Sequence, residues 1–321
     1  MSIWNFAISK NMKVAYATEN HKIMEFKLPK SLKKGPLLPQ VESKRLDAQG
    51  KCHLRTVRSI AYSDDAKYLA TASFDSTVLV YDLNSNSVPS ELSGHDNEIK
   101  SVSWSPYRPA PSERSNHHYT TTPTVHSRLL ATAGRDKCVW IWELYDNEWE
   151  SIAILQKHSQ DVKFTKWREI EDSKLELLSA GHDQTIKCWR YDDVVEDDWF
   201  MYQDIQVGIG TVWSLDIHQD MMCAVGENGI AIFKQNQQKW VKINSKDNAD
   251  DIYYSVDIRS DGLIVVACQD NCLRFFNEAL EDRGFLRSVS NEDLNCVKFI
   301  ADGKFVISSS DDGEMYVSVS E

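Results

Sequence analysis

A recurring frame of polar and aromatic residues constrains this chain more than any other feature. Four residue types, His, Ser or Thr, Asp and Trp, occur twice with the last three at identical spacing: His95, Thr132, Asp136 and Trp142, then His158, Ser179, Asp183 and Trp189. A shorter set repeats part of the frame: His53, Thr71 and Asp75. Fixed spacing with different residues in between predicts a repeat protein.

The chemistry of the four residue types explains their spacing. In a four-stranded blade, the Asp in the turn between the second and third strands accepts from the His ring. The ring meets the Ser or Thr hydroxyl, and the hydroxyl meets the Trp N–H. Deleting one partner leaves another buried and unpaired, at a cost of roughly 1–3 kcal/mol. We therefore interpret the frame as the structural network of WD40 propeller blades, not as a Ser-His-Asp catalytic set.

The same frame divides the whole chain into seven units. We predict an all-β, seven-bladed WD40 propeller that forms one domain over residues 1–321, because stacked repeats share a core and escape the usual size limit. Weaker turn residues, such as Asn20 and Asn228, mark the units beyond the strongest sets. The predicted blade cores span residues 3–28, 57–83, 99–144, 162–191, 212–234, 253–277 and 295–319.

The outer strand of each blade is expected between successive cores, and the last blade lacks one. Candidate outer strands cover residues 37–41, 88–92, 149–155, 199–205, 240–243 and 285–289. An unpaired edge near residues 315–319 would invite another chain. Either a closing strand precedes the recorded start, or a partner inserts a strand, as in coat-type propellers.

Residues 106–127 interrupt the third unit. Their Pro, Ser, Thr and His content cannot support a core, so we predict a flexible insertion loop on the lower face. Its three histidines, His117, His118 and His126, have no carboxylate or thiolate companions, so we expect no metal site there. The acidic stretch 192–198 is interpreted as a solvated hairpin tip.

Composition limits the function classes. A net charge of −12 disfavours direct nucleic-acid binding. The seven scattered cysteines include no C-x-x-C pair, which predicts reduced thiols and no zinc site. No apolar run is long enough for a signal peptide or a membrane span, so we expect a soluble intracellular protein. Phosphate loops, nucleophile elbows and metalloprotease motifs are absent, and we predict neither enzyme activity nor a cofactor.

Propeller ligands usually bind at the upper rim, where two positions per blade are exposed. One directly precedes the turn Asp, and the other lies early in the first strand. These positions place four cations on blades two to four, together with a histidine and several aromatic residues: Arg58, Lys100, Arg135, Lys163, His182, Trp4, Phe74, Trp213 and Tyr254. Such a surface suits an acidic and aromatic peptide, including a terminal carboxylate held by Arg. Alternatively, these residues are ordinary surface cations and aromatics that pack neighbouring blades.

Longer stretches resemble a particular family. The segments LLATAGRDKCVWIWE, LQKHSQDVKFTKW and TVWSLDI are similar to blades three to five of the WD40 protein of the cytosolic iron–sulfur cluster assembly machinery. The resemblance covers most of the chain and is most specific over residues 57–217. It implies a scaffold that binds neither iron nor sulfur. It also implies that Arg135 matches the family's functionally sensitive arginine and that clients present a short C-terminal tail ending in an aromatic residue and carboxylate.

The resemblance also implies partners and location. A scaffold of this targeting complex would hold a small α/β partner, a HEAT-repeat adaptor and a hydrogenase-like cluster carrier, and would dock apo iron–sulfur proteins in the cytoplasm and nucleus. No membrane partner is expected. Two other functions use the same fold: a structural coat or nuclear-pore-type propeller completed by a partner strand, and a ubiquitin-ligase or histone-type peptide reader.

Overall fold

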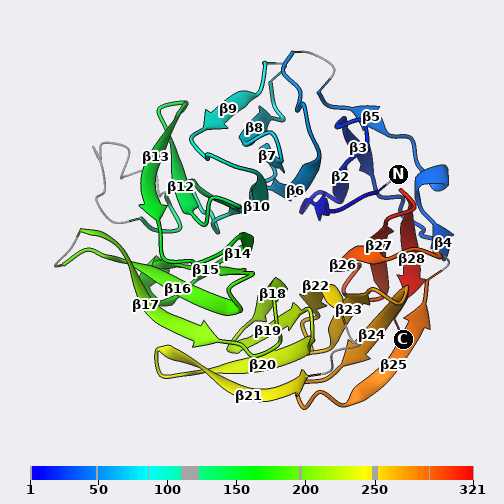
Figure 1. Cartoon of the computed structure of the whole chain (residues 1–321). Helices are drawn as coiled ribbons and strands as arrows, with labels where there is room; N and C mark the ends of the chain where they lie inside the picture. The colour runs from blue at the N-terminus through cyan, green and yellow to red at the C-terminus, as the bar shows by residue number, and fades with distance from the viewer. Residues whose placement is uncertain are drawn as a thin grey trace.

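Seven antiparallel sheets of four strands each surround a central axis in the computed structural model of the chain (Figure 1). The structure describes residues 2–47, 50–85, 87–109, 123–194, 197–247, 252–288 and 290–320. Within these ranges there is no α-helix, so none is long and apolar enough to cross a membrane. The predicted all-β, seven-bladed propeller is therefore confirmed.

Blades two to six each use four consecutive strands, ordered from the axis outward. Apolar residues pack both faces of each sheet against the neighbouring blades, so the second strand of each blade is almost wholly buried. Most of the outer strands are largely exposed. The strands are β6 (Val57–Tyr62), β7 (Tyr68–Ser73), β8 (Thr77–Asp82), β9 (Ser90–Ser93), β10 (Ile99–Trp104), β11 (Leu129–Gly134), β12 (Val139–Tyr145), β13 (Glu148–Leu155), β14 (Val162–Glu169), β15 (Leu175–Gly181), β16 (Thr185–Asp192), β17 (Asp198–Gln206), β18 (Val212–His218), β19 (Met221–Gly226), β20 (Gly229–Asn236), β21 (Lys239–Asp247), β22 (Tyr253–Ile258), β23 (Ile264–Cys268), β24 (Cys272–Phe276) and β25 (Asp282–Arg287).

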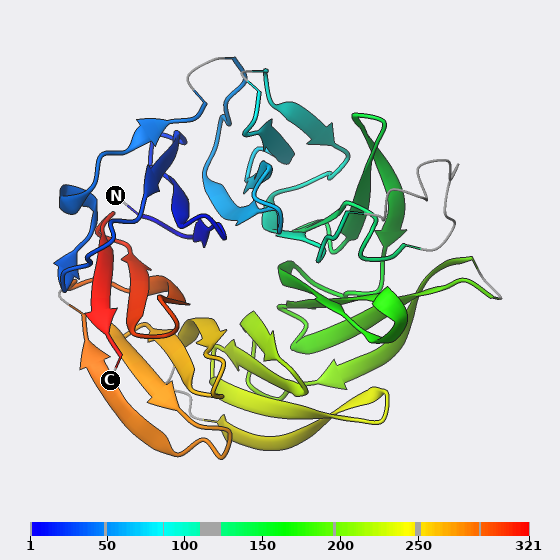
Figure 2. The ribbon, with the colours of Figure 1, turned by 180° about the vertical axis from the view of Figure 1, so that it is seen from behind.

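Blades one and seven complete each other through one connecting segment. Blade one contains β1 (Phe6–Ile8), β2 (Lys13–Ala17), β3 (Ile23–Lys27) and β5 (Lys44–Arg45), and blade seven contains β26 (Leu294–Ile300), β27 (Phe305–Ser310), β28 (Met315–Val319) and β4 (Gly35–Pro36). The segment that leaves blade one thus forms the outer strand of blade seven before it returns to its own blade. Figure 2 shows this blue segment beside the red strands of blade seven.

This arrangement corrects two predictions about the outer strands. The last blade does not lack its fourth strand, because β4 pairs with β28 through Tyr316↔Pro36 and Val317↔Gly35. Residues 37–41 are not the outer strand of blade one, since Leu38–Gln40 form a short 3₁₀ helix, η1. Leu37 is fully buried against blade seven. We call residues 35–41 the clasp.

The predicted insertion loop is ordered at both ends. Val125 is buried in the core shared by blades three and four, and its amide donates to the carbonyl of Ser173 at 3.0 Å. His126 Nδ1 lies 2.9 Å from the carbonyl of Arg108. The prediction that the whole of 106–127 has no fixed structure was therefore wrong for these ends. The reason is that Val125, a single apolar residue, is buried in the core. Residues 110–122, with His117 and His118, lie outside the described ranges.

The predicted polar frames form hydrogen-bonded networks inside their blades. His95 Nδ1 lies 2.6 Å from Asp136, its Nε2 lies 2.8 Å from Thr132 Oγ1, and Trp142 Nε1 donates to that hydroxyl at 2.9 Å. The second set is equivalent: His158–Asp183 at 2.8 Å, His158–Ser179 at 2.7 Å and Trp189–Ser179 at 2.9 Å. In both sets Nδ1 faces the carboxylate and can donate to it, while Nε2 faces the hydroxyl.

Blade two carries the shorter version of the network. His53 Nδ1 lies 3.1 Å from Asp75 and its Nε2 lies 2.8 Å from Thr71 Oγ1. Tyr81 stands where the other two blades have Trp, and the Thr71 hydroxyl donates to the carbonyl of Leu79 instead. Burial of the Asp75 carboxyl would raise its pKa, but bonds from His53 and Thr77 outweigh burial and hold that pKa well below its usual range.

Hydrogen bonds between neighbouring blades hold the inner strands around the axis. In each case a polar side chain in or just before one inner strand accepts from a backbone amide of the next blade. The donor and acceptor pairs are Ile60 to Asn5 (3.2 Å), Val102 to Ser59 (3.2 Å), Thr165 to Ser101 (3.0 Å), Ile258 to Asp216 (2.9 Å), Val297 to Ser255 (3.3 Å) and Phe299 to Asp257 (2.8 Å). These bonds fix the inner strands relative to one another.

Candidate functional site

The upper rim of the ring is formed by the turns between the second and third strands and by the beginnings of the inner strands. The nine residues selected from the sequence lie at these positions on blades one to six. The structure brings most of them together as cation and aromatic pairs. None of the four aromatic rings is fully exposed; each is half-buried, so the expectation of exposed aromatic surface holds only for part of each ring.

Three cations of the inner strands each face an aromatic ring of the rim. Lys100 Nζ lies 3.8 Å from the centroid of the Phe74 ring. Arg58 Cζ lies 5.3 Å from the Trp4 centroid, and Lys163 Nζ lies 5.1 Å from the Trp213 centroid. The negative face of each ring attracts the cation, which fixes the position of the charge at the channel mouth.

Edge-to-face contacts extend the aromatic row across blades four to six. The rings of His182 and Trp213 are 5.7 Å apart, and those of Trp213 and Tyr254 are 5.9 Å apart, both in T-shaped geometry. Thr211 holds His182 through a 2.9 Å hydrogen bond to Nδ1. Tyr254 donates to Asp293 at 3.2 Å. The row is therefore pre-organised, which lowers the entropic cost of placing another ring against it.

Burial and the crowding of like charges at the channel mouth lower the proton affinity of Lys163. Its side chain is 12% exposed. Burial, followed by the positive charge of Lys100, lowers the pKa of Lys163 to about 8. Burial also lowers the pKa of Arg58 and, together with Lys163, that of His182. Lys163 lies 3.7 Å from Asp161, and an incoming carboxylate would add a further counter-charge to the cluster.

Glu98 is one of two rim residues that sequence reasoning missed. Its carboxylate lies 2.7 Å from Lys100 Nζ, 2.9 Å from Arg55 and 3.7 Å from Arg135. These cations, Lys100 foremost, lower the pKa of Glu98. Glu98 therefore neutralises part of the predicted cationic patch. Alternation along a strand, which puts Glu98 and Lys100 on one side, is the signal that would have revealed it.

Arg135 is the rim cation whose accessibility matters most for ligand binding. Its side chain is 57% exposed, against 11% for Lys100. The predicted arginine is thus not covered by neighbouring loops, and its 3.7 Å distance to Glu98 leaves its donors open. Arg55, also missed, lies 5.9 Å from the Phe74 centroid on the same side. Both guanidinium groups can meet a planar carboxylate.

A second cluster of charges, also not predicted, lies inside the channel below the rim. Lys166 pairs with Asp216 at 2.7 Å, and Lys298 pairs with Asp257 at 2.6 Å. Burial alone would raise the pKa of Asp216, but the two lysines outweigh it and the pKa is lowered. Burial, with the charge of Asp216, raises the pKa of Asp257. These pairs join inner strands of neighbouring blades and are part of the ring's structure.

The part of the chain that the structure describes contains neither a cluster of metal ligands nor a disulfide. No group of three or more His, Cys, Asp or Glu side chains is arranged to hold a metal ion among those residues. All seven cysteines are free. Cys268 and Cys272 are buried beside the turn of blade six, as expected for core or turn residues.

The repeats and the ring together define a WD40-repeat propeller protein, a class that typically serves as a scaffold for protein interactions. The WD domain, G-beta repeat, matches residues 46–82 and 285–317. The crystal structure of the WD40 β-propeller domain of Doa1 superposes with a TM-score of 0.73 at 15% identity and covers 100% of this chain and 93% of that one.

Curated relatives give the family. The probable cytosolic iron-sulfur protein assembly protein 1 of Vanderwaltozyma polyspora is 30% identical over 272 residues, covering 63% of this chain and 73% of the relative. The chain belongs to the family of cytosolic iron-sulfur protein assembly protein 1. The relative of the same name from Chaetomium globosum is 32% identical over 145 residues, but this match spans only 27% of its length. The Caenorhabditis elegans homologue is 34% identical over 93 residues, 22% of its length.

Proposed function

We propose that this protein is a non-catalytic scaffold in the maturation of iron–sulfur proteins in the cytosol and nucleus. The names of its relatives support the cytosolic assembly role. The protein would dock apo iron–sulfur proteins on its upper rim and hold the other components of a targeting complex: a small α/β partner, a HEAT-repeat adaptor and a hydrogenase-like cluster carrier. It would itself bind no cluster and catalyse no reaction.

One observation carries the proposed docking site. Three cations of consecutive inner strands crowd the channel mouth beside an aromatic row, and Arg135 stands exposed next to them. Burial and the positive charge of Lys100 lower the pKa of Lys163 at this mouth. A C-terminal tail offers a carboxylate for the cations and an aromatic side chain for Trp213 or Tyr254. Arg135 would hold the carboxylate, with Lys100 and Lys163 adding positive potential.

A tail-binding experiment tests this proposal. A fluorescent peptide that ends in an acidic residue and tryptophan with a free carboxylate is titrated with the full chain, and anisotropy gives the dissociation constant. The same peptide with a C-terminal amide is the matched probe. We expect the amide to bind at least tenfold more weakly, since it loses a charge-assisted bond of about 1.5–3 kcal/mol. Equal binding of the two peptides would show that the terminal carboxylate is not recognised.

Substitution at the rim locates the site. Arg135→Glu should abolish binding of the free-acid peptide and pull-down of client proteins, because it places a negative charge beside the tail. The melting temperature should stay nearly unchanged, since the side chain is mostly exposed. Lys157→Glu, an exposed lysine between blades three and four, is the control and should bind as the unchanged chain does.

A further inference from the structure

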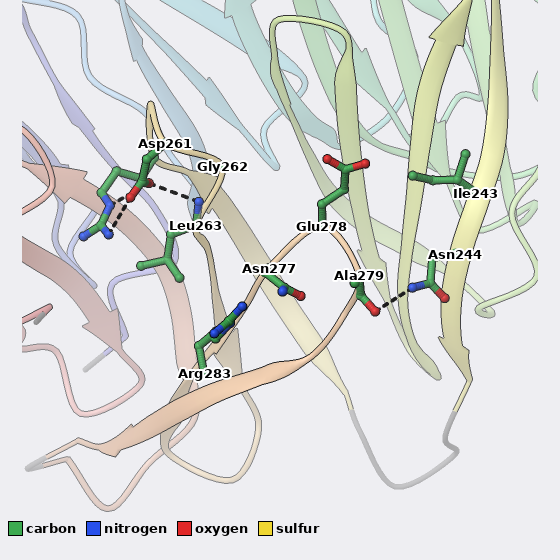
Figure 3. A pocket seen from close by; sticks show the side chains of 10 residues that line it. Ile243, Asn244, Asp261, Gly262, Leu263, Asn277, Glu278, Ala279 and Arg283 are labelled. Carbon is green, nitrogen blue, oxygen red and sulfur yellow. Dashed lines mark hydrogen bonds and ion pairs between the residues drawn. The ribbon is translucent and has the colours of Figure 1, made fainter.

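The lower face of blades six and seven carries a groove that the rim site does not use. The groove has a volume of about 490 Å³ and is lined by Leu263, Phe275, Phe285, Leu286 and Val319 together with two cations. It shares Leu263 and Arg283 with a second hollow of about 870 Å³ that continues along blade six toward Ile243 on β21. Figure 3 shows Arg283 on β25, with its guanidinium directed toward the turn at Asn277.

The apolar side chains of this groove are unusually accessible. Phe285 is 63% exposed, and Val319 is 37% exposed at the end of β28. Phe275, which is buried in the core shared by blades six and seven, also lines the groove. Contiguous apolar surface of this kind, rimmed by charges, marks a site of interaction with another molecule.

The charges around the groove favour an acidic ligand. Lys34 and Arg283 line it directly, and the acids of the adjoining hollow are already bound, Asp261 to Arg259 at 2.9 Å and Glu278 to Lys234 at 2.6 Å. Arg283 meets only the exposed Glu281, at 3.2 Å. The segment 27–45 has six cations and one acid, although the chain as a whole has a net charge of −12. Its exposed lysines Lys30 and Lys33 extend the positive surface beyond Lys34.

The backbone beside the groove offers a place for an extended chain. The carbonyl of Met315 accepts from Leu37, and the next residue of β28 that faces the clasp, Val317, is opposite Gly35. By the same alternation, the N–H and C=O of Val319 point outward. The clasp strand begins at Gly35, and no described residue pairs with the backbone of Val319 on that side. A strand edge of this kind accepts an extended peptide.

We propose that this lower groove binds an extended, acidic segment of a partner protein whose alternate residues are apolar. The apolar side chains would enter between Leu263, Phe285 and Val319, the carboxylates would meet Lys34 and Arg283, and the peptide backbone would pair with Val319. The apolar lining and the strand edge favour a peptide over a nucleic acid, which would use the cations alone. This second surface is independent of the rim, so the scaffold would hold two ligands on opposite faces.

Four probes test the chemistry on the full chain by fluorescence anisotropy. They are an eight-residue peptide of alternating glutamate and valine, the same peptide with lysine for glutamate, the same peptide with serine for valine, and an eight-nucleotide DNA strand. We expect only the glutamate and valine peptide to bind measurably. Equal binding of the lysine or serine peptide would overturn the proposal, and so would stronger binding of the DNA.

Two variants locate the binding. K34E/R283E should weaken the glutamate and valine peptide at least roughly tenfold, because two attractions become repulsions. F285S should weaken it through loss of apolar contact. All three side chains are exposed or lie at the surface, and circular dichroism with thermal unfolding checks that both variants remain folded. Unchanged affinity in both folded variants would overturn the site.

Two further measurements separate this groove from the rim. R135E should bind the glutamate and valine peptide as the unchanged chain does; a loss as large as that of K34E/R283E would move the peptide to the rim and overturn the proposal. Hydrogen exchange of the Val319 amide should slow when the peptide is bound. Unaltered exchange at that amide under saturating peptide would exclude pairing with β28.

Discussion

The amide of Leu37 donates a 2.6 Å hydrogen bond to the carbonyl of Met315, and this bond joins the first blade's connecting segment to the last blade. Leu37 is also fully buried, among residues of blades one and seven that include Phe6, Ile307 and Val317. The clasp therefore closes the ring with the buried Leu37, the partly buried Leu38 and Val41, and a two-residue strand.

Leu37→Ala should lower the free energy of unfolding by about 2–5 kcal/mol, the usual cost of emptying a buried leucine site. Urea unfolding followed by tryptophan fluorescence measures the change. Pro39→Ala, an exposed position of the same segment, is the matched control and should change stability little. Amide exchange at Val317 should accelerate in Leu37→Ala. Equal stability of the two variants would show that the clasp does not close the ring.

Substituting the two tryptophans of β12 in turn distinguishes the contribution of the network's hydrogen bond from that of side-chain packing. Trp142 Nε1 donates to Thr132, whereas Trp140 Nε1 is buried without a partner among the described residues. Trp142→Phe should therefore destabilise the protein by about 1–3 kcal/mol more than Trp140→Phe, because it also leaves Thr132 with one bond fewer. Denaturant unfolding of both variants checks the difference. A smaller loss for Trp142→Phe would contradict the role given to the network.

Removing the carboxylate of Glu98 should strengthen tail binding. Glu98 competes with a ligand for Lys100, Arg55 and Arg135. In Glu98→Gln these three cations become available, and affinity for the free-acid tail peptide should rise by roughly threefold to tenfold, with a steeper loss in salt. Anisotropy titrations at two salt concentrations measure both effects. Weaker binding by Glu98→Gln would indicate that Glu98 positions the cations instead of masking them.

Tail binding should weaken as pH rises from 7 to 9. Lys163 has a pKa lowered to about 8, mainly by burial and by Lys100, so it is charged below this pH and neutral above it. The pKa of Tyr254 is raised to about 12 by burial and by Asp293, and that of His182 is lowered, so neither gains or loses a charge in this range. Loss of the Lys163 charge should reduce affinity roughly tenfold.

Lys163→Arg is the matched variant for this pH dependence. The arginine stays protonated throughout the range, so the fall between pH 7 and 9 should disappear while binding at pH 7 persists. Lys163→Met should bind weakly at every pH. A fall of the same size in Lys163→Arg would assign the pH dependence to another group.

The number of blades and their order could be predicted from the sequence because the polar frame needs buried partners at fixed strand positions. His95, Thr132, Asp136 and Trp142 can satisfy one another only in one blade geometry. The outer strands of blades one and seven could not be predicted in this way. A strand of two residues, such as β4 or β5, has no alternation to detect, and its partner is set by ring closure.

The rim was predictable in position but not in its internal contacts. Strand alternation places Lys100 and Lys163 at the channel mouth, as expected. Whether Lys100 meets Phe74 depends on the rotation between two neighbouring blades, which no local pattern encodes. Glu98 lies outside the two rim positions that the pattern marks in each blade, and the charge balance depends on residues of blades two and three together.

Ring closure through the clasp also sets an order for synthesis on the ribosome. Residues 35–41 leave the exit tunnel early, but the β28 edge that receives them is translated more than two hundred residues later. Until then the apolar site of Leu37 is incomplete, and the segment that leaves the first blade has no strand to pair with. This short apolar segment would therefore be accessible to chaperones during most of translation.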